Sequence, residues 1–341
     1  MKKIAIIGAG ISGLTAAREL QPKHDVIVFE KSRGRGGRTA HKRLEWGNFD
    51  IGAQYFTARS TEFKKQVDDW LQKGCVKEWE FTPLKLEQKA ERAMLVASSD
   101  STERYIGNPG MNSIAHDLSN NINIKFNVRV KTIVPTSNDC LELFDDKNNL
   151  LGSFDSVIIA VPAEQTIDLL PDDTSFRNSI PSSLHTPCWA VGIKTPKKVA
   201  PEIQGAFGDK TVSWVSRQSA KQYLFQSSPM QTDIDDNIEQ DDFWMLHFSP
   251  EWSTKNLEAT KPEVFAHAKS WFTRVFKVPV DEQNYLVHFW RYANLKDNTL
   301  SNIFWDNNLK IGAIGDWSSG GRIEGAFTSA LNLINAENFK L

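Results

Sequence analysis

The chain has 341 residues, of which 40% are hydrophobic and 24% charged, and this length can form two domains or one large discontinuous domain. The formal net charge is −2 and the 40 basic residues are spread along the sequence, so no basic block indicates a nucleic acid or a membrane surface as a partner. Three distant cysteines without a CxxC pair predict neither disulfides nor a metal site, and no apolar stretch approaches the ~20 residues that span a bilayer. We therefore expect a cytoplasmic protein.

The first 30 residues have the pattern of a βαβ unit. Residues 4–7 are a short apolar run typical of a buried parallel strand, glycines follow, and a helical pattern continues to Leu20. Residues 25–30 predict a second buried strand, which ends in the acid Glu30.

A GxGxxG motif lies between the first strand and the helix; it comprises Gly8, Gly10, Ile11, Ser12 and Gly13. In such a motif the first glycine permits a tight turn, the second lets the backbone approach a pyrophosphate, and the third allows close helix–strand packing. The helix N-terminus offers unpaired N–H groups to phosphates, and Glu30 can accept hydrogen bonds from ribose hydroxyls. These features predict a dinucleotide site; the alternative is a tight glycine turn with a structural role only.

Arginines and glycines follow the acidic strand end, as Arg33-Gly34-Arg35-Gly36-Gly37-Arg38. Paired glycines allow the backbone to lie against a cofactor, and guanidinium groups neutralise phosphate charge. A basic surface turn is the alternative. The later segment Gly52-Ala53-Gln54-Tyr55-Phe56 combines small, polar and aromatic residues, which suits a position beside a flat ring system.

Two later apolar runs predict further central strands: residues 156–162, stopped by Pro162, and residues 309–314, which lead into Gly315-Asp316-Trp317. Residues 325–333 predict a helix. The middle of the chain is richer in Trp, Gln, Asn and Lys and has mixed strand and helix patterns. We therefore predict an α/β protein with a discontinuous Rossmann-type domain and an inserted, mixed α+β substrate domain. The first comprises residues 1–56, 106–164 and 286–341, and the second comprises residues 57–105 and 165–285.

Short segments spaced along almost the whole chain carry a family resemblance. Residues 30–38 are similar to the second fingerprint of the flavin-containing amine oxidase superfamily. More specific segments are residues 31–34, 36–38, 52–59, 107–111, 290–293, 315–317 and 321–326. Together they resemble the bacterial renalases, a family within that superfamily.

The resemblance implies the two-domain architecture of amine oxidases and p-hydroxybenzoate hydroxylase, with one FAD bound per chain. It implies that Asp316 hydrogen-bonds the ribitol or pyrophosphate region, that a helix beginning near Gly325 points its N-terminus at the flavin pyrimidine edge, and that Arg129 and Val130 lie near the adenine. We expect non-covalent binding, because no cysteine lies near the C-terminal flavin segment. The predicted FAD contacts are Gly8, Gly10, Ile11, Ser12, Gly13, Glu30, Lys31, Arg33, Gly36, Gly37, Arg38, Gly52, Ala53, Gln54, Tyr55, Arg129, Val130, Ala160, Pro162, Gly315, Asp316, Gly325 and Ala326.

Residues over the flavin are predicted from their chemistry, since aromatic rings stack on planar groups and Arg or His can hold a carboxamide or a phosphate. The candidates are Gln54, Tyr55, His247, Trp290, Arg291, Tyr292 and Trp317. The chain has 11 tryptophans, so each aromatic candidate can equally be a core residue. His247 lies in an alternating, strand-like run and can equally be a structural histidine.

Renalases, as a family, oxidise 2- and 6-dihydro-NAD(P) to NAD(P)⁺, and O2 reoxidises their flavin with formation of H2O2. Such a substrate becomes aromatic on losing hydride and needs no general base, which agrees with the lack of an acid–base constellation in the sequence. Three alternatives stay open. The chain can be an amine oxidase that binds a small amine in an aromatic cage, a redox-inactive binding protein such as the GDP-dissociation inhibitors of related fold, or an NAD-linked dehydrogenase.

Overall fold

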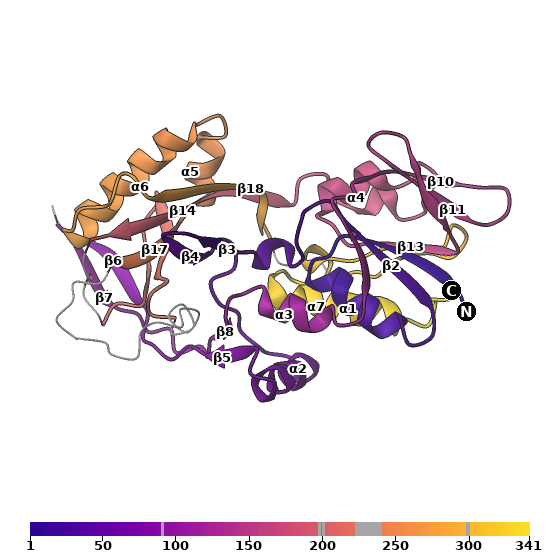
Figure 1. Ribbon diagram of the computed structural model, residues 1–341, viewed down its shortest axis with the longest axis horizontal. Coiled ribbons are helices and arrows are strands. Elements are labelled where there is room, and N and C mark those ends of the chain that lie inside the picture. Colours follow the sequence, from indigo (N-terminus) through magenta and orange to yellow (C-terminus); the bar gives the residue numbers. More distant parts are fainter. Residues whose placement is uncertain (90–91, 197–198, 200–201, 222–240, 298–300) are drawn as a thin grey trace.

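The computed structural model describes the chain except for residues 90–91, 197–198, 200–201, 222–240 and 298–300. Figure 1 shows two lobes, each built around one large sheet, with both chain termini at the far end of one lobe. We call the lobe that contains the termini the nucleotide lobe and the other the substrate lobe. Within the described residues no helix is long and apolar enough to cross a membrane.

The nucleotide lobe is centred on a six-stranded sheet with the order β19-β20-β13-β1-β2-β9. Its strands are parallel except for β19, which pairs with β20 in the antiparallel sense. The strands are β1 (Lys3–Ile7), β2 (Asp25–Glu30), β9 (Asn123–Phe126), β13 (Ser156–Ile159), β19 (Phe304–Asp306) and β20 (Ile311–Ala313). The four strands predicted from apolar runs are confirmed, and the Rossmann-type arrangement with them.

Alternate residues of these strands enter two separate cores, one on each face of the sheet. On the first face Ile4 and Ile6 pack beneath helices α1 and α7, with α2 and α3 in the same core. On the second face Ala5 and Ile7 pack beneath helix α4 and a three-stranded antiparallel sheet. These elements are α1 (Ile11–Leu20), α2 (Thr61–Gln72), α3 (Ser113–Leu118), α4 (Ala163–Leu169), α7 (Arg322–Ile334), β10 (Val130–Pro135), β11 (Leu141–Asp145) and β12 (Leu150–Phe154).

The substrate lobe is built on a seven-stranded sheet with the order β18-β14-β17-β16-β15-β6-β7. Its strands are β6 (Leu84–Lys89), β7 (Arg92–Ala97), β14 (His185–Thr195), β15 (Gly205–Phe207), β16 (Val212–Arg217), β17 (Asp242–Phe248) and β18 (Tyr285–Leu295). Helices α5 (Pro250–Lys255) and α6 (Lys261–Phe276) cover one face of this sheet over a core that includes Val191 and Leu246.

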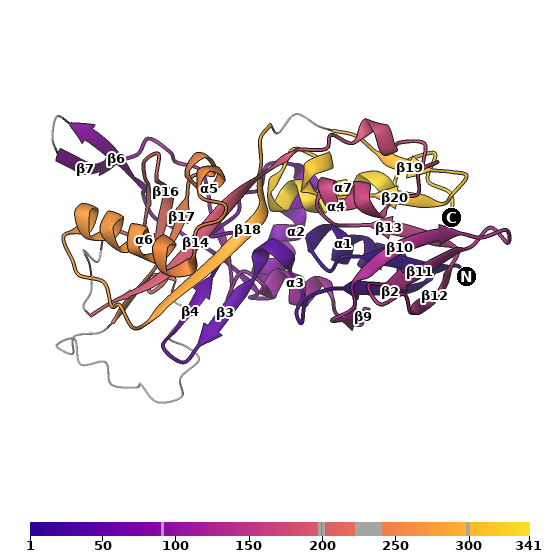
Figure 2. The same ribbon diagram turned by 90° about the horizontal axis from the view of Figure 1, so that it is seen from above.

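The opposite face of the seven-stranded sheet receives a hairpin from the N-terminal part of the chain. This hairpin consists of β3 (His41–Leu44) and β4 (Gly47–Asp50), and Figure 2 shows it beside β18 and β14. Phe49 and the adjacent Ile51 pack against Ala190 of β14 and Met245 of β17. The remaining short elements are β5 (Val76–Glu78), β8 (Tyr105–Gly107) and the 3-10 turns η1 (Gly37–Thr39), η2 (Arg177–Ser179) and η4 (Asp316–Ser318).

The chain is divided between the lobes differently from the sequence-based division at three places. Residues 286–295, expected in the FAD-binding domain, lie in β18, which pairs with β14 from Tyr285 to Leu295. Helix α2, expected in the substrate domain, buries Phe63 and Trp70 in the nucleotide-lobe core. Residues 170–184 likewise pack in the nucleotide lobe, through Leu170 and Phe176 among others. The reason is that an amphipathic pattern marks a buried face but does not indicate which core buries it.

Glu164, in the first turn of α4, joins the nucleotide lobe to the start of β14. Its Oε1 accepts hydrogen bonds from the backbone N–H groups of Leu184 (2.8 Å) and His185 (2.9 Å), and its Oε2 lies 2.7 Å from His185 Nδ1. Burial works to raise the pKa of Glu164, but these hydrogen bonds lower it to about 2. The carboxylate is therefore ionised at neutral pH and stabilises the junction between the lobes.

We expect Glu164→Gln to lower the free energy of unfolding by about 1–3 kcal/mol at pH 7, because hydrogen bonds to a partly buried charge are lost. The folded-state pKa is depressed, so the contribution of the carboxylate is present above the ordinary pKa of 4.5 and is lost as the pH falls toward 2. Urea denaturation of both proteins at decreasing pH measures this. A stability difference that does not shrink below pH 4.5 would contradict the assignment.

Candidate functional site

The glycine turn after β1 has one position that is packed tightly and one that is open. A Cβ on Gly13 would clash with the carbonyl oxygen of Gly8 and reach Ala160 Cβ at 3.0 Å, so helix α1 lies directly against the turn. A Cβ on Gly10 would meet no atom within 4 Å. Gly10 precedes α1 as its N-cap residue and has no side-chain cap. The open space therefore lies where the helix dipole and unpaired N–H groups favour an anion.

Glu30 lies at the end of β2 beside this turn and is 7% exposed. One carboxylate oxygen accepts from the backbone N–H of Ala9 (2.8 Å), and the other accepts from that of Ser32 (2.7 Å). Each oxygen can accept a further hydrogen bond. Glu30 is thus held where it can accept a hydrogen bond from a ribose hydroxyl beside the turn.

A second glycine segment stacks on the first. Gly36 has φ +105°, a conformation that favours glycine, and its N–H donates to the carbonyl of Ala9 at 2.8 Å. A Cβ on Gly37 would come within 3.7 Å of Gly10 Cα. Two backbone segments without side chains therefore face each other, and they fit a pyrophosphate held by backbone groups.

Arg38 connects this segment to the C-terminal part of the chain. Its guanidinium forms a two-pronged ion pair with Asp316, with N–O distances of 2.6 and 3.0 Å, and also donates to the carbonyl of Ala293 at 3.4 Å. Asp316 opens the turn η4, and Gly321, the N-cap of α7, donates its N–H to the Asp316 carbonyl at 2.7 Å. Arg38, Asp316 and the N-terminus of α7 therefore come together, although 278 residues separate the first two.

The backbone from Ile51 to Ala53 lies where the two lobes meet. The Ile51 carbonyl accepts from Trp290 Nε1 (2.9 Å) and faces His247 Nε2 (3.3 Å). The Ala53 N–H donates to the Arg38 carbonyl at 2.9 Å, and a Cβ on Gly52 would approach both that carbonyl and the Trp290 ring. The structure thus brings Gly52 and Ala53 of the first lobe beside Trp290 and His247 of the second.

Gln54 belongs to a buried polar network and not to an open surface. Its Oε1 accepts from Ser216 Oγ and Gln218 Nε2, both at 2.7 Å, and its Nε2 donates to the carbonyls of Asp50 and Gly52. The side chain therefore has its hydrogen-bonding capacity filled by protein. Its role in the structure is to fix the course of residues 50–54.

The centre of the same network is a fully buried ion pair between Asp50 and Lys221, 2.8 Å apart. Asp50 also accepts from the backbone of Met111 (2.9 Å) and lies 2.8 Å from His41 Nδ1. Burial would raise the pKa of Asp50, but the Lys221 ammonium and His41 hold it well below its usual range. The sequence analysis missed Lys221 and His41, because nothing local marks a pair that is 171 residues apart.

Two histidines on this face are neutral at pH 7. Burial lowers the pKa of His247 to about 4. Burial, followed by the charges of Lys42 and Lys261, lowers the pKa of His288 to about 4 as well. The His288 ring meets the Trp290 ring edge-to-face with centroids 4.3 Å apart. The sequence analysis did not identify His288, although its i, i+2 spacing from Trp290 on a strand was the available signal.

The other aromatic candidates have different surroundings. Tyr292 is partly buried and packs against the His185 ring, with centroids 6.0 Å apart. Arg291 is exposed and its guanidinium lies over the Phe289 ring. Tyr55 packs against Trp214 with ring centroids 5.5 Å apart and beneath the Arg104 guanidinium.

Trp317 was expected in the substrate cavity, and this expectation requires a correction. The side chain is fully buried, its Nε1 donates to the Val161 carbonyl at 3.0 Å, and its ring packs on Phe304. An indole contributes a large apolar surface, and here that surface and its one donor are used entirely inside the nucleotide-lobe core.

The remaining predicted FAD contacts are distributed over several elements. Ser12 and Ile11 are buried in the first turn of α1, and Val130 is the buried first residue of β10. Lys31, Arg33 and Arg129 are exposed beyond the end of β2. Gly325 lies in the first turn of α7 against the Ser319 carbonyl. The other predicted contacts are Ala160, which follows β13, Pro162, the N-cap of α4, Gly315, the N-cap of η4, and Ala326 in α7.

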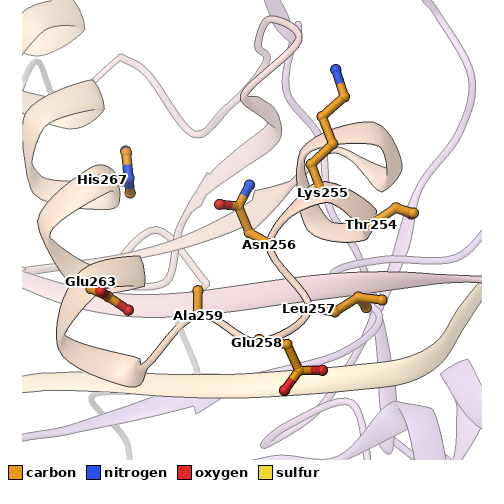
Figure 3. A pocket seen from close by; sticks show the side chains of 8 residues that line it. All are labelled: Thr254, Lys255, Asn256, Leu257, Glu258, Ala259, Glu263 and His267. Atoms are coloured by element: carbon orange, nitrogen blue, oxygen red, sulfur yellow. The ribbon is translucent and has the colours of Figure 1, made fainter.

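A separate hollow of about 400 Å³ lies between α5 and α6 and is lined by Lys255, Asn256, Glu258, Glu263 and His267 among others. Figure 3 shows that several of these side chains point away from one another. Glu263 already accepts from Thr260 in the capping box of α6. This hollow lies on the helix-covered side of the seven-stranded sheet and is not part of the site. Among the described residues no group of three or more His, Cys, Asp or Glu is arranged to hold a metal ion.

Comparison with known proteins agrees with this geometry. Residues 6–71 match the NAD(P)-binding Rossmann-like domain, and residues 78–332 match the family described as flavin containing amine oxidoreductase. The chain belongs to the flavin containing amine oxidoreductase family. It is an FAD-dependent oxidoreductase. We propose that the facing glycine segments at Gly10 and Gly37, together with Glu30 and the Arg38–Asp316 pair, bind the FAD.

Similar structures extend over the whole chain at low sequence identity. A proposed protoporphyrinogen oxidase from Exiguobacterium sp. 255-15 has a TM-score of 0.73 at 12% identity, covering 100% of this chain and 99% of its own. An oxidoreductase from Methanosarcina mazei has a TM-score of 0.70 at 13% identity, covering 98% and 100%. Wild-type putrescine oxidase bound to putrescine has a TM-score of 0.65 at 13% identity, covering 98% and 99%. At such identities the likeness shows the fold.

A curated relative matches only a short segment. The 4,4'-diapophytoene desaturase of Staphylococcus aureus (strain Newman) is 43% identical over 51 residues, which is 15% of this chain and 10% of the desaturase. The match therefore spans about a tenth of that relative's length and says nothing of a shared substrate.

The two glycines of the turn offer a matched pair of variants. Gly10→Ala adds a methyl group to open space at φ −79°, so we expect unchanged apoprotein stability and a loss of bound FAD. Gly13→Ala forces α1 away from the turn, so we expect a loss of stability with or without FAD. Thermal denaturation of the apoproteins and the 450 nm absorbance after dialysis distinguish the two. Full FAD retention by Gly10→Ala would show that the phosphates do not lie there.

Breaking the buried ion pair has a predictable cost. We expect Lys221→Met to lower the free energy of unfolding by about 3–5 kcal/mol, because Asp50 is left buried without its counter-charge. The double variant Asp50→Asn/Lys221→Met should regain most of the loss. The control Lys269→Met removes an exposed pair with Glu282 and should cost about 1 kcal/mol or less. Equal losses in Lys221→Met and the control, measured by urea denaturation, would refute the role of the buried pair.

Proposed function

We propose that this enzyme is an oxidase that converts 2- and 6-dihydro isomers of NAD(P) to NAD(P)⁺ and reduces O2 to H2O2. The proposal goes beyond the family assignment and joins the renalase-like sequence segments to the chemistry of the site. When bound, FAD supplies the hydride acceptor and the route of the electrons to O2. The protein's residues bind the substrate, orient it and exclude water.

The observation that carries the proposal is the character of the substrate-lobe surface beside Gly52. It presents the indole of Trp290 and the two neutral histidines His247 and His288. The nearby carboxylate of Asp50, two residues before Gly52, is already paired with Lys221. An uncharged planar dihydropyridine suits such a surface, because it can stack on an aromatic ring and donate its carboxamide N–H to a neutral acceptor.

The proposed reaction requires no base at this surface. The substrate becomes an aromatic pyridinium when hydride leaves, so no proton has to be removed from carbon. Positioning of the ring then supplies the main catalytic effect. Trp290 is fixed by its hydrogen bond to the Ile51 carbonyl, and His247 by its contact with the same oxygen, so both are placed before substrate arrives.

An amine oxidase activity is the second candidate, and membership of the flavin containing amine oxidoreductase family favours it. The partly buried rings of Trp290 and Tyr292 could hold an amine.

We place the enzyme in the cytoplasm, where NAD(P) is reduced and oxidised. Its three free cysteines suit a reducing compartment.

Anaerobic rapid mixing distinguishes the two activities. We expect 2- or 6-dihydro-NAD to bleach the flavin absorbance within seconds, and NAD⁺ to be the product, because these isomers present a hydride at C2 or C6 to a preformed site. Monoamines and diamines should leave the flavin oxidised under the same conditions. Fast bleaching by an amine, with slow or no bleaching by the dihydropyridines, would overturn the proposed substrate.

A further inference from the structure

One row of side chains crosses four neighbouring strands of the substrate-lobe sheet, β16, β17, β14 and β18, which lie side by side in Figure 2. Trp214 of β16 is opposite His247 of β17. His247 is opposite Ala190 of β14, and Ala190 is opposite His288 of β18. Residues directly opposite each other on antiparallel strands share one face of the sheet. Ala190 packs against Ile51, so the whole row faces the segment that lies between the lobes.

A β-bulge turns Trp214 to this face. Val212, two residues earlier in β16, lies in the core beneath helix α6, and in a regular strand Trp214 would point to the same side. The register of β16 against β17 shifts between Val212 and Trp214, so Trp214 points to the opposite side. Its ring packs against Phe207, with centroids 4.9 Å apart, and against Tyr55, with centroids 5.5 Å apart. The bulge therefore brings the indole to the chain segment that contains Gly52 and Tyr55.

Two ring nitrogens of this row are buried and have no hydrogen-bond partner within the described part of the chain. They are Nε1 of Trp214 and Nδ1 of His247. The Trp214 side chain belongs to a residue that is only 8% exposed, and its indole N–H can only donate. A buried polar group without a partner costs free energy, and a ligand that pairs with it recovers that cost.

The other nitrogen of His247 decides the role of Nδ1. Nε2 lies 3.3 Å from the Ile51 carbonyl, which can only accept, so Nε2 carries the proton. The ring is neutral at pH 7, because burial lowers its pKa to about 4. Nδ1 of such a ring has a free lone pair and is an acceptor. A donor on Trp214 and an acceptor on His247 therefore stand opposite each other on strands that are about 4.8 Å apart.

This pair adjoins the surface proposed to hold the dihydropyridine ring. Trp290 donates its Nε1–H to the same Ile51 carbonyl that faces His247, so the two rings meet at one oxygen atom. The Trp290 ring also lies against Gly52, at 3.3 Å from the position of a Cβ on that residue. Across the sheet from β18, His247 comes before Trp214. A ring beside Trp290 can therefore direct a substituent at both unpartnered nitrogens.

We propose that Trp214 and His247 bind the carboxamide of the substrate: Trp214 Nε1–H donates to the carboxamide oxygen, and the carboxamide N–H donates to His247 Nδ1. A primary carboxamide carries an acceptor and a donor on one carbon, which matches this pair. A carboxylate has no hydrogen to donate to His247, and a protonated amine cannot accept from Trp214. The proposal rests on the dihydropyridine proposed above and adds the two residues that recognise its carboxamide.

Binding of benzamide to the FAD-loaded protein tests the pair without hydride transfer, because benzamide is an uncharged planar ring that carries a carboxamide. Acetophenone has the same ring and carbonyl but lacks the N–H2 group. By isothermal titration calorimetry we expect His247→Phe to raise the Kd of benzamide about fivefold and that of acetophenone less than about twofold. Trp214→Phe should raise both Kd values about fivefold, because both ligands lose the same donor.

Trp271→Phe is the matched control for Trp214→Phe. It removes an indole N–H from helix α6, which covers the opposite face of the sheet, and this N–H already donates to Asp209 at 3.0 Å. Both Kd values should change by less than about twofold, because the two positions share no partner. Unchanged FAD content and melting temperature verify that the variants with altered binding are folded.

The carboxamide site and the proposed reaction can fail separately. If benzamide and acetophenone behave as expected but no dihydropyridine bleaches the flavin, the carboxamide site stands and the reaction is wrong. An equal rise in both Kd values for His247→Phe would show a structural effect and overturn the proposal. So would benzamide binding that Trp271→Phe weakens as much as Trp214→Phe, binding that no variant alters, or no binding at millimolar concentration, whatever the dihydropyridines do.

Discussion

The structure depends on how residues 50–54 are held between the lobes. Asp50 begins this segment with a fully buried carboxylate, and such a charge is tolerated only because Lys221 and further donors surround it. The next residues are fixed from both sides, by Arg38 of the nucleotide lobe at Ala53 and by Trp290 of the substrate lobe at Ile51. A shift of either lobe would leave the buried charge or these backbone groups without partners. The relative position of the lobes at the flavin site is therefore determined by polar contacts whose loss is costly.

The two lobes contribute different kinds of groups. The nucleotide lobe offers mainly backbone, because Gly10 and Gly37 have no side chains that would cover the N-terminus of α1. The substrate lobe offers side chains from one face of its sheet, with Trp290 and His288 on β18 and His247 on β17. Backbone recognition suits a cofactor that stays the same, and side-chain recognition suits substrates that differ among relatives.

The sequence was sufficient where the signal is local. The strands β1, β2, β13 and β20 and the helices α1 and α7 follow from apolar runs and glycine positions, and the family from short motifs near them. It was insufficient where the outcome depends on partners far away. Nothing near Lys221 indicates that its charge is buried against Asp50, and the surroundings of Trp317 in the sequence resemble those of a ligand-binding turn although its ring is core. Strand β18 likewise belongs to the seven-stranded sheet because it pairs with β14, which lies far from it in the sequence.

A dinucleotide and an amine substrate differ in the charge of the group that would lie in the substrate lobe. Putrescine, which is bound in the structure of putrescine oxidase, is a diamine that carries positive charge at neutral pH. Burial, followed by the charges of Lys42 and Lys261, lowers the pKa of His288 to about 4, so a positive charge is disfavoured next to Trp290. The uncharged dihydropyridine ring of the proposed substrate does not meet this penalty. We therefore expect the electrostatics next to Trp290 to act against an amine and in favour of the proposed dihydropyridine.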